Sequence, residues 1–418
     1  MKKKHIFLSV LVILLLVLYL IPATQQDFIT SYKKDDKASK SFVTFMKKPT
    51  KKILINTIKW KYLSYGKGTK TILFIHGMGG AYNLWWQQME FFKDNYKVIS
   101  YTLPEEINNL QDASDGVLKI LEQEQVENLY VVGTSMGGYI AQYLTHKIPN
   151  RIEKVVFGNT FPPNTVIETK NKTKSEVIPW LPEIVISKLG QKKLNNEIVP
   201  AGNNSELLKA FLPSLPFSKK QFINRYYVVI DKFIPNPNLY KIKRIPKLII
   251  ESDNDPLVEK ILRDKLKETY GNASVFTFHN QGHFPYINSA AKYNEVLANF
   301  FDAENNFASL ENTVANYFEG RRNADTTLLS KAFDAKAILF TVKDSLVFKI
   351  PLKAYLDKVK QDGKTNVTTR ILDANIQGKM ATCNTIFEYK TKTYKDYLSL
   401  LKVNNTWKIT SKNFIQVK

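Results

Sequence analysis

Residues 131–138 read Val131-Val132-Gly133-Thr134-Ser135-Met136-Gly137-Gly138 and are the most informative stretch of the 418-residue chain. An apolar run leads into Gly-x-Ser-x-Gly, and a helical pattern follows it. A serine between two glycines, with a buried strand before it and a helix after it, is typical of a sharp turn that exposes the serine hydroxyl. Ser135 is therefore the candidate nucleophile.

The segments around this turn alternate between strand and helix patterns. The expected strands are 58–62, 71–75, 97–101, 129–132, 154–157, 246–250 and 274–278. The expected helices are 81–94, 111–125, 136–148, 258–270 and 290–302. Such alternation predicts an α/β fold with a doubly wound, mostly parallel sheet.

A serine hydroxyl is a weak nucleophile at neutral pH, so it needs a base in hydrogen-bond reach and a third group that orients the base. The acid is expected just after the strand at 246–250, where Asp255 stands ahead of the next helix. Asp253 is the second choice for the acid. If Asp253 is not the acid, its side chain is expected to stabilise the turn instead. The base is expected in the loop after the last strand, which holds His283.

Glycines also follow the strand at 71–75, in His76-Gly77-Met78-Gly79-Gly80. Glycine lets the backbone come close to a reacting group and point its N–H groups inward. We therefore expect the backbone N–H groups of Met78 and Met136 to hold an oxyanion. The sequence predicts no metal site and no cofactor, and the substrate-binding residues stay unassigned.

Four motifs occur in order between residues 52 and 304: HGMGG at 76–80, GTSMGG at 133–138, IIESDNDPLV at 249–258 and QGHFPY at 281–286. With them this segment resembles the α/β-hydrolase superfamily, and GTSMGGYIAQ, VVFGNTF and GHFPY look closest to its maspardin-like members. Sequences of that group can lack the catalytic histidine. This chain has His283, so no non-catalytic role is carried over.

The resemblance and the residues together favour a serine hydrolase that cleaves an ester or related acyl bond of a small molecule. Ser135, His283 and Asp255 would form its catalytic triad, and the reaction would pass through an acyl-enzyme. An acyltransferase would use the same triad. The alternative from another class is a non-catalytic binding or assembly protein that retains the fold.

Residues 161–240 interrupt the alternation with prolines and apolar helical stretches, which predicts a helical lid inserted into a hydrolase domain over 51–304. A packed insertion without a role at the site is the alternative. After residue 304, two helices (308–319 and 325–333) precede mainly antiparallel strands, a pattern that predicts an α+β domain over 305–418.

The stretches LENTVANYFEGRRNADTTLLSKAF and YLSLLKVNNTWKITSKNF of this second domain are similar to the NTF2-like, putative lumazine-binding group. The resemblance implies a curved sheet around a cone-shaped cavity. No side chain in these stretches stands out as an acid or base, so binding or assembly is favoured over catalysis. A homodimer through this domain is left open.

The N-terminus places three lysines before an apolar run over 6–21. This pattern favours an uncleaved signal-anchor, a transmembrane helix over 1–24, over a cleaved signal peptide, with the catalytic domains on the extracytoplasmic side. The lysine-rich residues 25–50 are expected to be a polar tether. The net charge is +22, but the lysines are scattered, which favours a solvated surface and predicts no nucleic-acid partner.

Overall fold

A computed structural model describes residues 17–417, and the chain divides into two compact units. The first unit consists of Met1–Pro237 and Ile245–Asp302. The second consists of Asn238–Arg244 and Ala303–Lys418. Separate clusters of buried apolar side chains fill the two units, so each is described by itself.

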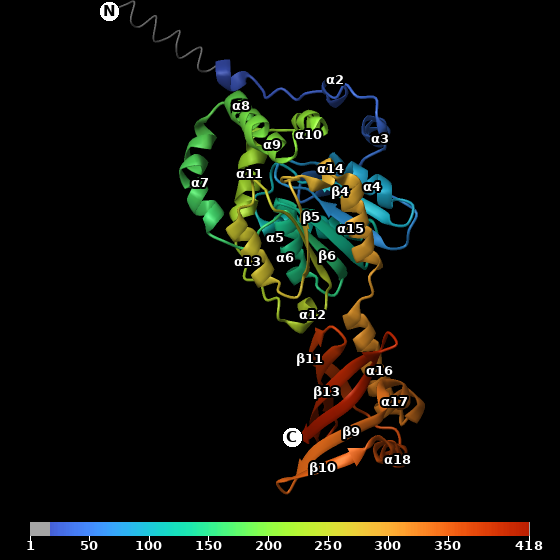
Figure 1. The fold of residues 1–418 in the computed structure, drawn as a ribbon. Coiled ribbons are helices and arrows are strands. Elements are labelled where there is room, and N and C mark those ends of the chain that lie inside the picture. The colour runs from blue at the N-terminus through green and yellow to red at the C-terminus, as the bar shows by residue number, and fades with distance from the viewer. Residues whose placement is uncertain (1–16, 418) are drawn as a thin grey trace, which may run out of the picture. The chain divides into compact units, whose positions relative to one another are not determined.

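An eight-stranded sheet with the order β1-β2-β4-β3-β5-β6-β7-β8 forms the centre of the first unit (Figure 1). Its strands are β1 (Lys51–Ile55), β2 (Ile58–Tyr65), β3 (Thr71–Ile75), β4 (Lys97–Thr102), β5 (Leu129–Thr134), β6 (Ile152–Gly158), β7 (Lys247–Ser252) and β8 (Ser274–Phe278). β1 and β2 run antiparallel, and every pair from β4 to β8 is parallel. The predicted doubly wound, mostly parallel sheet is confirmed.

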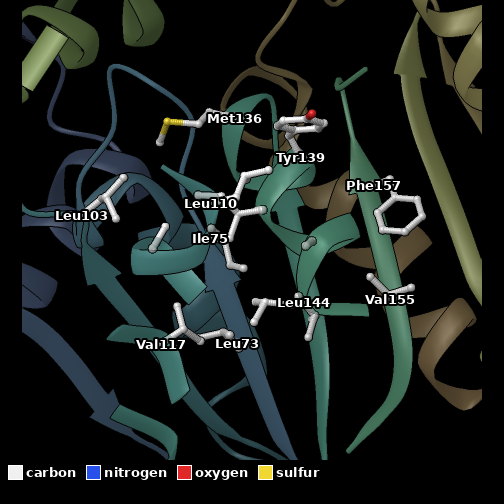
Figure 2. Packing of buried hydrophobic residues seen from close by; sticks show 14 of the residues in the cluster. Leu73, Ile75, Leu103, Leu110, Val117, Met136, Tyr139, Leu144, Val155 and Phe157 are labelled. Carbon is white, nitrogen blue, oxygen red and sulfur yellow. The ribbon is translucent and has the colours of Figure 1, made fainter. Parts of the chain in front are cut away.

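Helices cover both faces of this sheet. They are η1 (Tyr82–Trp85), α4 (Trp86–Phe92), α5 (Leu110–Gln123), α6 (Met136–Lys147), α13 (Lys260–Thr269), α14 (Pro285–Asn288) and α15 (Ala290–Asp302). Side chains alternate along β3: Leu73 and Ile75 pack with α5 and α6, while Ile72 and Phe74 pack into the cluster of α4 and α15. Figure 2 shows the first of these two layers.

The carboxyl ends of the parallel strands meet at one edge of the sheet, where α/β proteins bind their ligands. The loops after β3, β5, β6, β7 and β8 all open at this edge. They begin at His76, Ser135, Asn159, Asp253 and His279, so the motifs singled out in the sequence gather there.

All the regular secondary structure in the insertion after β6 is helical. It contains α7 (Val166–Val177), η2 (Ile178–Trp180), α8 (Glu183–Lys193), η3 (Leu194–Ile198), α9 (Val199–Ala201), α10 (Glu206–Phe211), η4 (Leu212–Ser214) and α11 (Lys219–Ile230). α7 buries no residue and α8 buries only Ile186. α11 buries four residues and packs against α6, so the insertion has a loosely packed outer part and a firmly held inner helix.

The N-terminal segment differs from the expected polar tether over 25–50. It folds into α2 (Phe28–Ser31) and α3 (Lys37–Met46). Phe28 and Phe42 lie edge to face with each other, and both contact Phe211 of α10. The aromatic side chains, rather than the lysines between them, decide the structure, because burying them removes large apolar surfaces from water.

The predicted membrane location is corrected. Within residues 17–417, no helix combines the length and the apolar character that crossing a membrane requires. The helical residues Val17–Leu20 end just before Pro22, because a proline disfavours helical backbone at the residue before it. Ala23 then donates its N–H to Glu183 of α8 at 3.1 Å. Residues 1–16 of the predicted anchor lie outside the described residues.

The second unit is a six-stranded sheet in the order β10-β9-β14-β13-β12-β11, packed with helices. Its elements are α12 (Tyr240–Lys243), α16 (Asn306–Asn323), α17 (Thr326–Ala332), β9 (Phe333–Lys343), β10 (Leu346–Pro351), α18 (Leu352–Asp362), β11 (Thr368–Gln377), β12 (Met380–Glu388), β13 (Thr393–Val403) and β14 (Thr406–Gln416). All strand pairs are antiparallel except β9 with β14. The predicted α+β domain is present, and α18 is a helix that the sequence pattern did not predict.

Candidate active site

Ser135 lies on the turn between β5 and α6, with φ 54° and ψ −123°. Positive φ is costly for a residue with a side chain, and such strain is stored mainly at functional sites. Its N–H donates to the carbonyl of Gly158 at 2.9 Å, and its carbonyl accepts from the Thr160 hydroxyl at 2.6 Å. β6 therefore holds the strained turn from one side.

The two glycines of Gly-x-Ser-x-Gly are required by close backbone approach. A Cβ at Gly133 would lie 2.2 Å from the carbonyl oxygen of Gly137. A Cβ at Gly137 would lie 2.2 Å from the carbonyl oxygen of Ile75, at the end of β3. Neither position has room for a side chain, so the motif follows from the packing of β3, β5 and α6.

His283 and Asp255 form a buried pair at the same edge of the sheet. His283 Nδ1 lies 2.8 Å from Asp255 Oδ2, and the side chains are 3% and 0% exposed. The carboxylate accepts, so Nδ1 carries the proton and Nε2 is left with its lone pair. A neutral imidazole in this tautomer can take a proton at Nε2.

Several donors fix the Asp255 carboxylate. The backbone N–H groups of Leu257 and Val258 donate to Oδ1 at 2.8 and 3.0 Å, and Asn159 Nδ2 donates to Oδ2 at 3.0 Å. Burial alone would raise the pKa of Asp255. The electrostatic attraction and hydrogen bond of the His283 ring, with the bonds from Asn159 and Leu257, outweigh burial and lower that pKa.

Asp253, the fallback acid, binds other partners. Its carboxylate accepts from Nδ1 of His279 at 2.7 Å and from the N–H of Asn280 at 2.9 Å. The His279 side chain is 78% exposed, so this second pair lies at the surface. Of the two acids left open by the sequence, Asp255 is the one paired with His283.

The residues at and just after the end of β6 link the serine turn to the histidine–aspartate pair. Asn159, which has φ 41°, donates to Asp255, while the residues on either side of it hold Ser135. In the described residues no hydrogen bond joins Ser135 Oγ to His283, a contact that often tightens only when substrate binds. The sequence analysis missed Asn159; its position directly after a predicted strand was the available signal.

The glycine loop after β3 lies against Ser135. A Cβ at Gly77 would be 3.2 Å from Cβ of Ser135 and 3.8 Å from its Oγ. Among residues 17–417 no acceptor binds the N–H of Met78 or of Met136. Met136 begins α6, whose N-terminus carries partial positive charge. Both N–H groups are thus available to a developing negative charge.

The insertion touches the histidine and acid loops through α9 and the residue after it. Asn254, next to Asp255, donates its side-chain amide to the carbonyl of Ala201 at 2.8 Å. A Cβ at Gly282, next to His283, would lie 3.0 Å from the backbone of Ala201 and Gly202. Part of the insertion therefore packs directly on the loops that carry the catalytic candidates.

In the described part of the chain, no cluster of three or more His, Cys, Asp or Glu residues could hold a metal ion.

A buried polar group lies among the aromatic side chains of the second unit. Lys412 Nζ lies 3.0 Å from Asp396 Oδ2, and the Tyr317 hydroxyl donates to the same oxygen at 2.5 Å. Asp396 Oδ1 has no hydrogen-bond partner among the described residues, and Lys412 Nζ lies 5.3 Å from the centre of the Tyr355 ring. The sequence did not predict this polar group. Its members come from four separate elements, α16, α18, β13 and β14, and only the fold brings them together.

Comparison with known proteins gives two family matches. Residues 70–198 match the family described as "alpha/beta hydrolase fold". Residues 305–415 match the family described as "Putative lumazine-binding". A solved hydrolase of Pseudomonas aeruginosa PA01 superposes with a TM-score of 0.53 at 17% identity, covering 62% of this chain and 100% of that one. The first unit therefore has the α/β-hydrolase fold.

Two relatives extend these matches. The chain is 24% identical over 258 residues to maspardin of Mus musculus, which covers 59% of this chain and 81% of maspardin. It is 30% identical over 109 residues to the dihydrolipoyllysine-residue acetyltransferase component of the acetoin cleaving system of Cupriavidus necator, which covers 24% of this chain and 29% of that protein. The chain is thus similar to α/β-hydrolases over residues 70–198, to the putative lumazine-binding family over residues 305–415, and to maspardin over 258 residues.

Proposed function

We propose that the protein is a serine hydrolase that cleaves a carboxylic ester or a related acyl bond of a small molecule. The observation that carries the proposal is the buried His283–Asp255 pair at the sheet edge where Ser135 occupies a strained turn. A serine at this position, rather than an aspartate, argues against epoxide-hydrolase or dehalogenase chemistry.

In the proposed reaction, Ser135 Oγ attacks the acyl carbon and its proton passes to His283 Nε2. Asp255 keeps Nδ1–H in place and stabilises the imidazolium that forms. The N–H groups of Met78 and Met136 hold the oxyanion of the tetrahedral intermediate. The intermediate collapses, the alcohol leaves with the proton from Nε2, and a water repeats the sequence to release the acid.

We also propose that α7 and α8 act as a lid over the site. The two helices bury a single residue between them, Ile186, and weakly packed segments open at low free-energy cost. α9 and α11 would stay in place, because they bind the catalytic loops and the sheet core. For residues 305–418 we propose binding or assembly, with a homodimer as one form of it.

Labelling with a fluorophosphonate probe tests the function. The full chain is expected to take up one probe at Ser135, located by mass spectrometry of the peptides, and Ser135→Ala is expected to take up none. Ester hydrolysis should disappear in the same variant while its melting temperature is unchanged. Labelling elsewhere, or full activity of a folded Ser135→Ala protein, would contradict the proposal.

Acyl transfer to an acceptor other than water is a second candidate. It is favoured by the similarity to a relative that is named an acetyltransferase component. The residues would be the same, and only the group that resolves the acyl-enzyme would differ. Product analysis with added alcohol or thiol acceptors distinguishes the two, because a transferase forms the new ester in preference to the free acid.

A further inference from the structure

Arg225 of α11 is a buried cation whose partners are all backbone carbonyls. Its side chain is 0% exposed. Nη1 donates to the carbonyls of Met78 at 2.7 Å and Gly80 at 2.8 Å, and Nη2 donates to that of Leu103 at 2.7 Å. No carboxylate among the described residues forms an ion pair with it. A buried charge without a counter-ion is costly, so this contact is not explained by stability alone.

The three carbonyls belong to the glycine loop and to the residue after β4. Met78 and Gly80 are in the loop beside Ser135, and Leu103 lies where β4 ends. The planar guanidinium can reach them together because its donors point in fixed directions. One side chain from the insertion thus ties two loops of the sheet edge to α11.

His76 continues the same network. The N–H of Leu103 donates to His76 Nε2 at 2.9 Å, so Nε2 must be unprotonated. Nδ1 then carries the proton and donates it to the carbonyl of Gly77 at 2.7 Å. Burial, followed by the charge of Arg225, lowers the pKa of His76 to about 3, and the imidazole stays neutral.

The carbonyl of Gly77 determines where the Met78 N–H points. These two groups belong to one trans peptide unit and therefore face in opposite directions. The carbonyl of Gly77 is held by His76 and also by the N–H of Gly80 at 2.9 Å. The Met78 N–H must then point away from His76, and it is the N–H that the proposed reaction assigns to the oxyanion.

We propose that Arg225 is a positioning residue that orients the oxyanion-binding N–H of Met78. It acts directly through the carbonyls of Met78 and Gly80, and indirectly through Leu103, His76 and Gly77. The inference rests on the proposed function, since it concerns the same hydrolytic site. It also gives the insertion a part in the reaction that does not depend on covering the substrate.

The test compares Arg225→Gln with Arg151→Gln in the full chain, using p-nitrophenyl butyrate. Arg151 is a matched control, because it also donates to backbone carbonyls, those of Glu127 and Val126, where β5 begins and not where it ends. Loss of one oxyanion donor lowers kcat by about 100- to 1000-fold, so a misdirected donor should lower it by about 10- to 100-fold. KM should stay near that of the wild type, and Arg151→Gln should keep the wild-type kcat.

A second readout separates positioning from general damage. A trifluoromethyl ketone adds to the serine as an oxyanion, whereas a product carboxylate binds without one. Arg225→Gln should bind the ketone about 10- to 100-fold more weakly and the carboxylate as the wild type does. Added guanidinium should restore part of the kcat of Arg225→Ala, which it would not do for a merely destabilised protein.

The possible outcomes separate a failure of the proposed role of Arg225 from a failure of the proposed hydrolase function. If wild-type turnover does not depend on Ser135, the proposed function fails. If wild-type turnover depends on Ser135 but Arg225→Gln keeps kcat and ketone affinity, only the role of Arg225 is overturned. If Arg225→Gln does not fold, the same measurements are made on Arg225→Lys. A lower kcat is expected there too, because one ammonium group cannot reproduce the planar fork of the guanidinium.

Discussion

His283 Nδ1 lies 2.8 Å from Oδ2 of Asp255, and both side chains are almost fully removed from solvent. Asp253 is only two residues from Asp255 in the chain. Among the described residues it forms no bond to His283 and binds His279 instead. Adjacent loops therefore carry two histidine–aspartate pairs, one buried and one exposed. Only the buried pair can keep a fixed tautomer free of competition from water.

This difference predicts unequal effects of two otherwise matched substitutions. Asp255→Asn should lower kcat for ester hydrolysis by about 10⁴-fold, because the amide no longer holds the imidazole in the reactive tautomer. Asp253→Asn should change kcat by no more than about twofold, as expected for an exposed side chain. Steady-state kinetics at constant pH measure both, and a larger loss in Asp253→Asn would move the acid to that residue.

Ser135 and His283 are expected to act as a unit. Ser135→Ala and His283→Ala should each remove nearly all activity above the buffer rate, and the double variant should be hardly slower than either. The reason is that neither the nucleophile nor the base accelerates the reaction without the other. The double-mutant cycle is measured on kcat for one ester. Losses that multiply would show that the two residues act independently.

Glu124, near the C-terminal end of α5, predicts a pH effect on stability away from the site. Its carboxylate binds four groups: Lys51 at 2.7 Å, Ser64 at 2.8 Å, Lys97 at 3.0 Å and Tyr62 at 3.0 Å. Burial raises the pKa of Glu124, but these partners outweigh it and lower that pKa to about 2, from 4.5. The folded state therefore favours the ionised form.

A lowered carboxyl pKa stabilises the fold above the unfolded-state value, and this contribution is lost as the pH falls toward the folded-state value. Glu124→Gln should therefore reduce stability by about 2 kcal/mol at pH 7, and the difference from wild type should vanish between about pH 4.5 and pH 2. Urea unfolding at several pH values measures it. Glu122→Gln is the control, since its side chain is 55% exposed; an equal effect there would contradict the prediction.

The buried pair of Lys412 and Asp396 predicts a stability effect in the second unit. Asp396→Ala should destabilise this unit by about 3–5 kcal/mol, because Lys412 would stay buried without its counter-ion. Replacing both members, with Asp396→Leu and Lys412→Met, should restore most of the loss. Melting curves of the full chain measure both. A double variant as unstable as Asp396→Ala would show that the pair does not determine stability here.

The sequence predicted the sheet of the first unit well because its buried strands are continuous apolar runs, such as 71–75. Features that depend on distant contacts were not predictable. Arg225 lies 147 residues from Met78 in the chain, and nothing in its local sequence indicates that contact. The many lysines of the N-terminal segment led to the prediction of a polar tether. The segment instead forms helices that bury four aromatic side chains: Phe28, Tyr32, Phe42 and Phe45.

The last prediction concerns the division of labour between the units. Residues 25–304 should fold and hydrolyse model esters without residues 305–418, because all the candidate catalytic groups lie between Met78 and His283. α12 belongs to the second unit, where Ile242 is buried and Tyr240 donates to Glu311 at 2.6 Å. The shortened chain would therefore expose Ile242 to water, and Ile242→Ser should improve its solubility.

The measurement compares kcat/KM of residues 25–304 carrying Ile242→Ser with that of the full chain carrying the same substitution. The two values should agree, since the substitution is present in both and only the second unit differs. The full-length variant also controls for any effect of Ile242 itself. If the shortened protein is folded by circular dichroism yet inactive on esters that the full chain cleaves, residues 305–418 complete the active site, and their proposed role in binding or assembly is wrong.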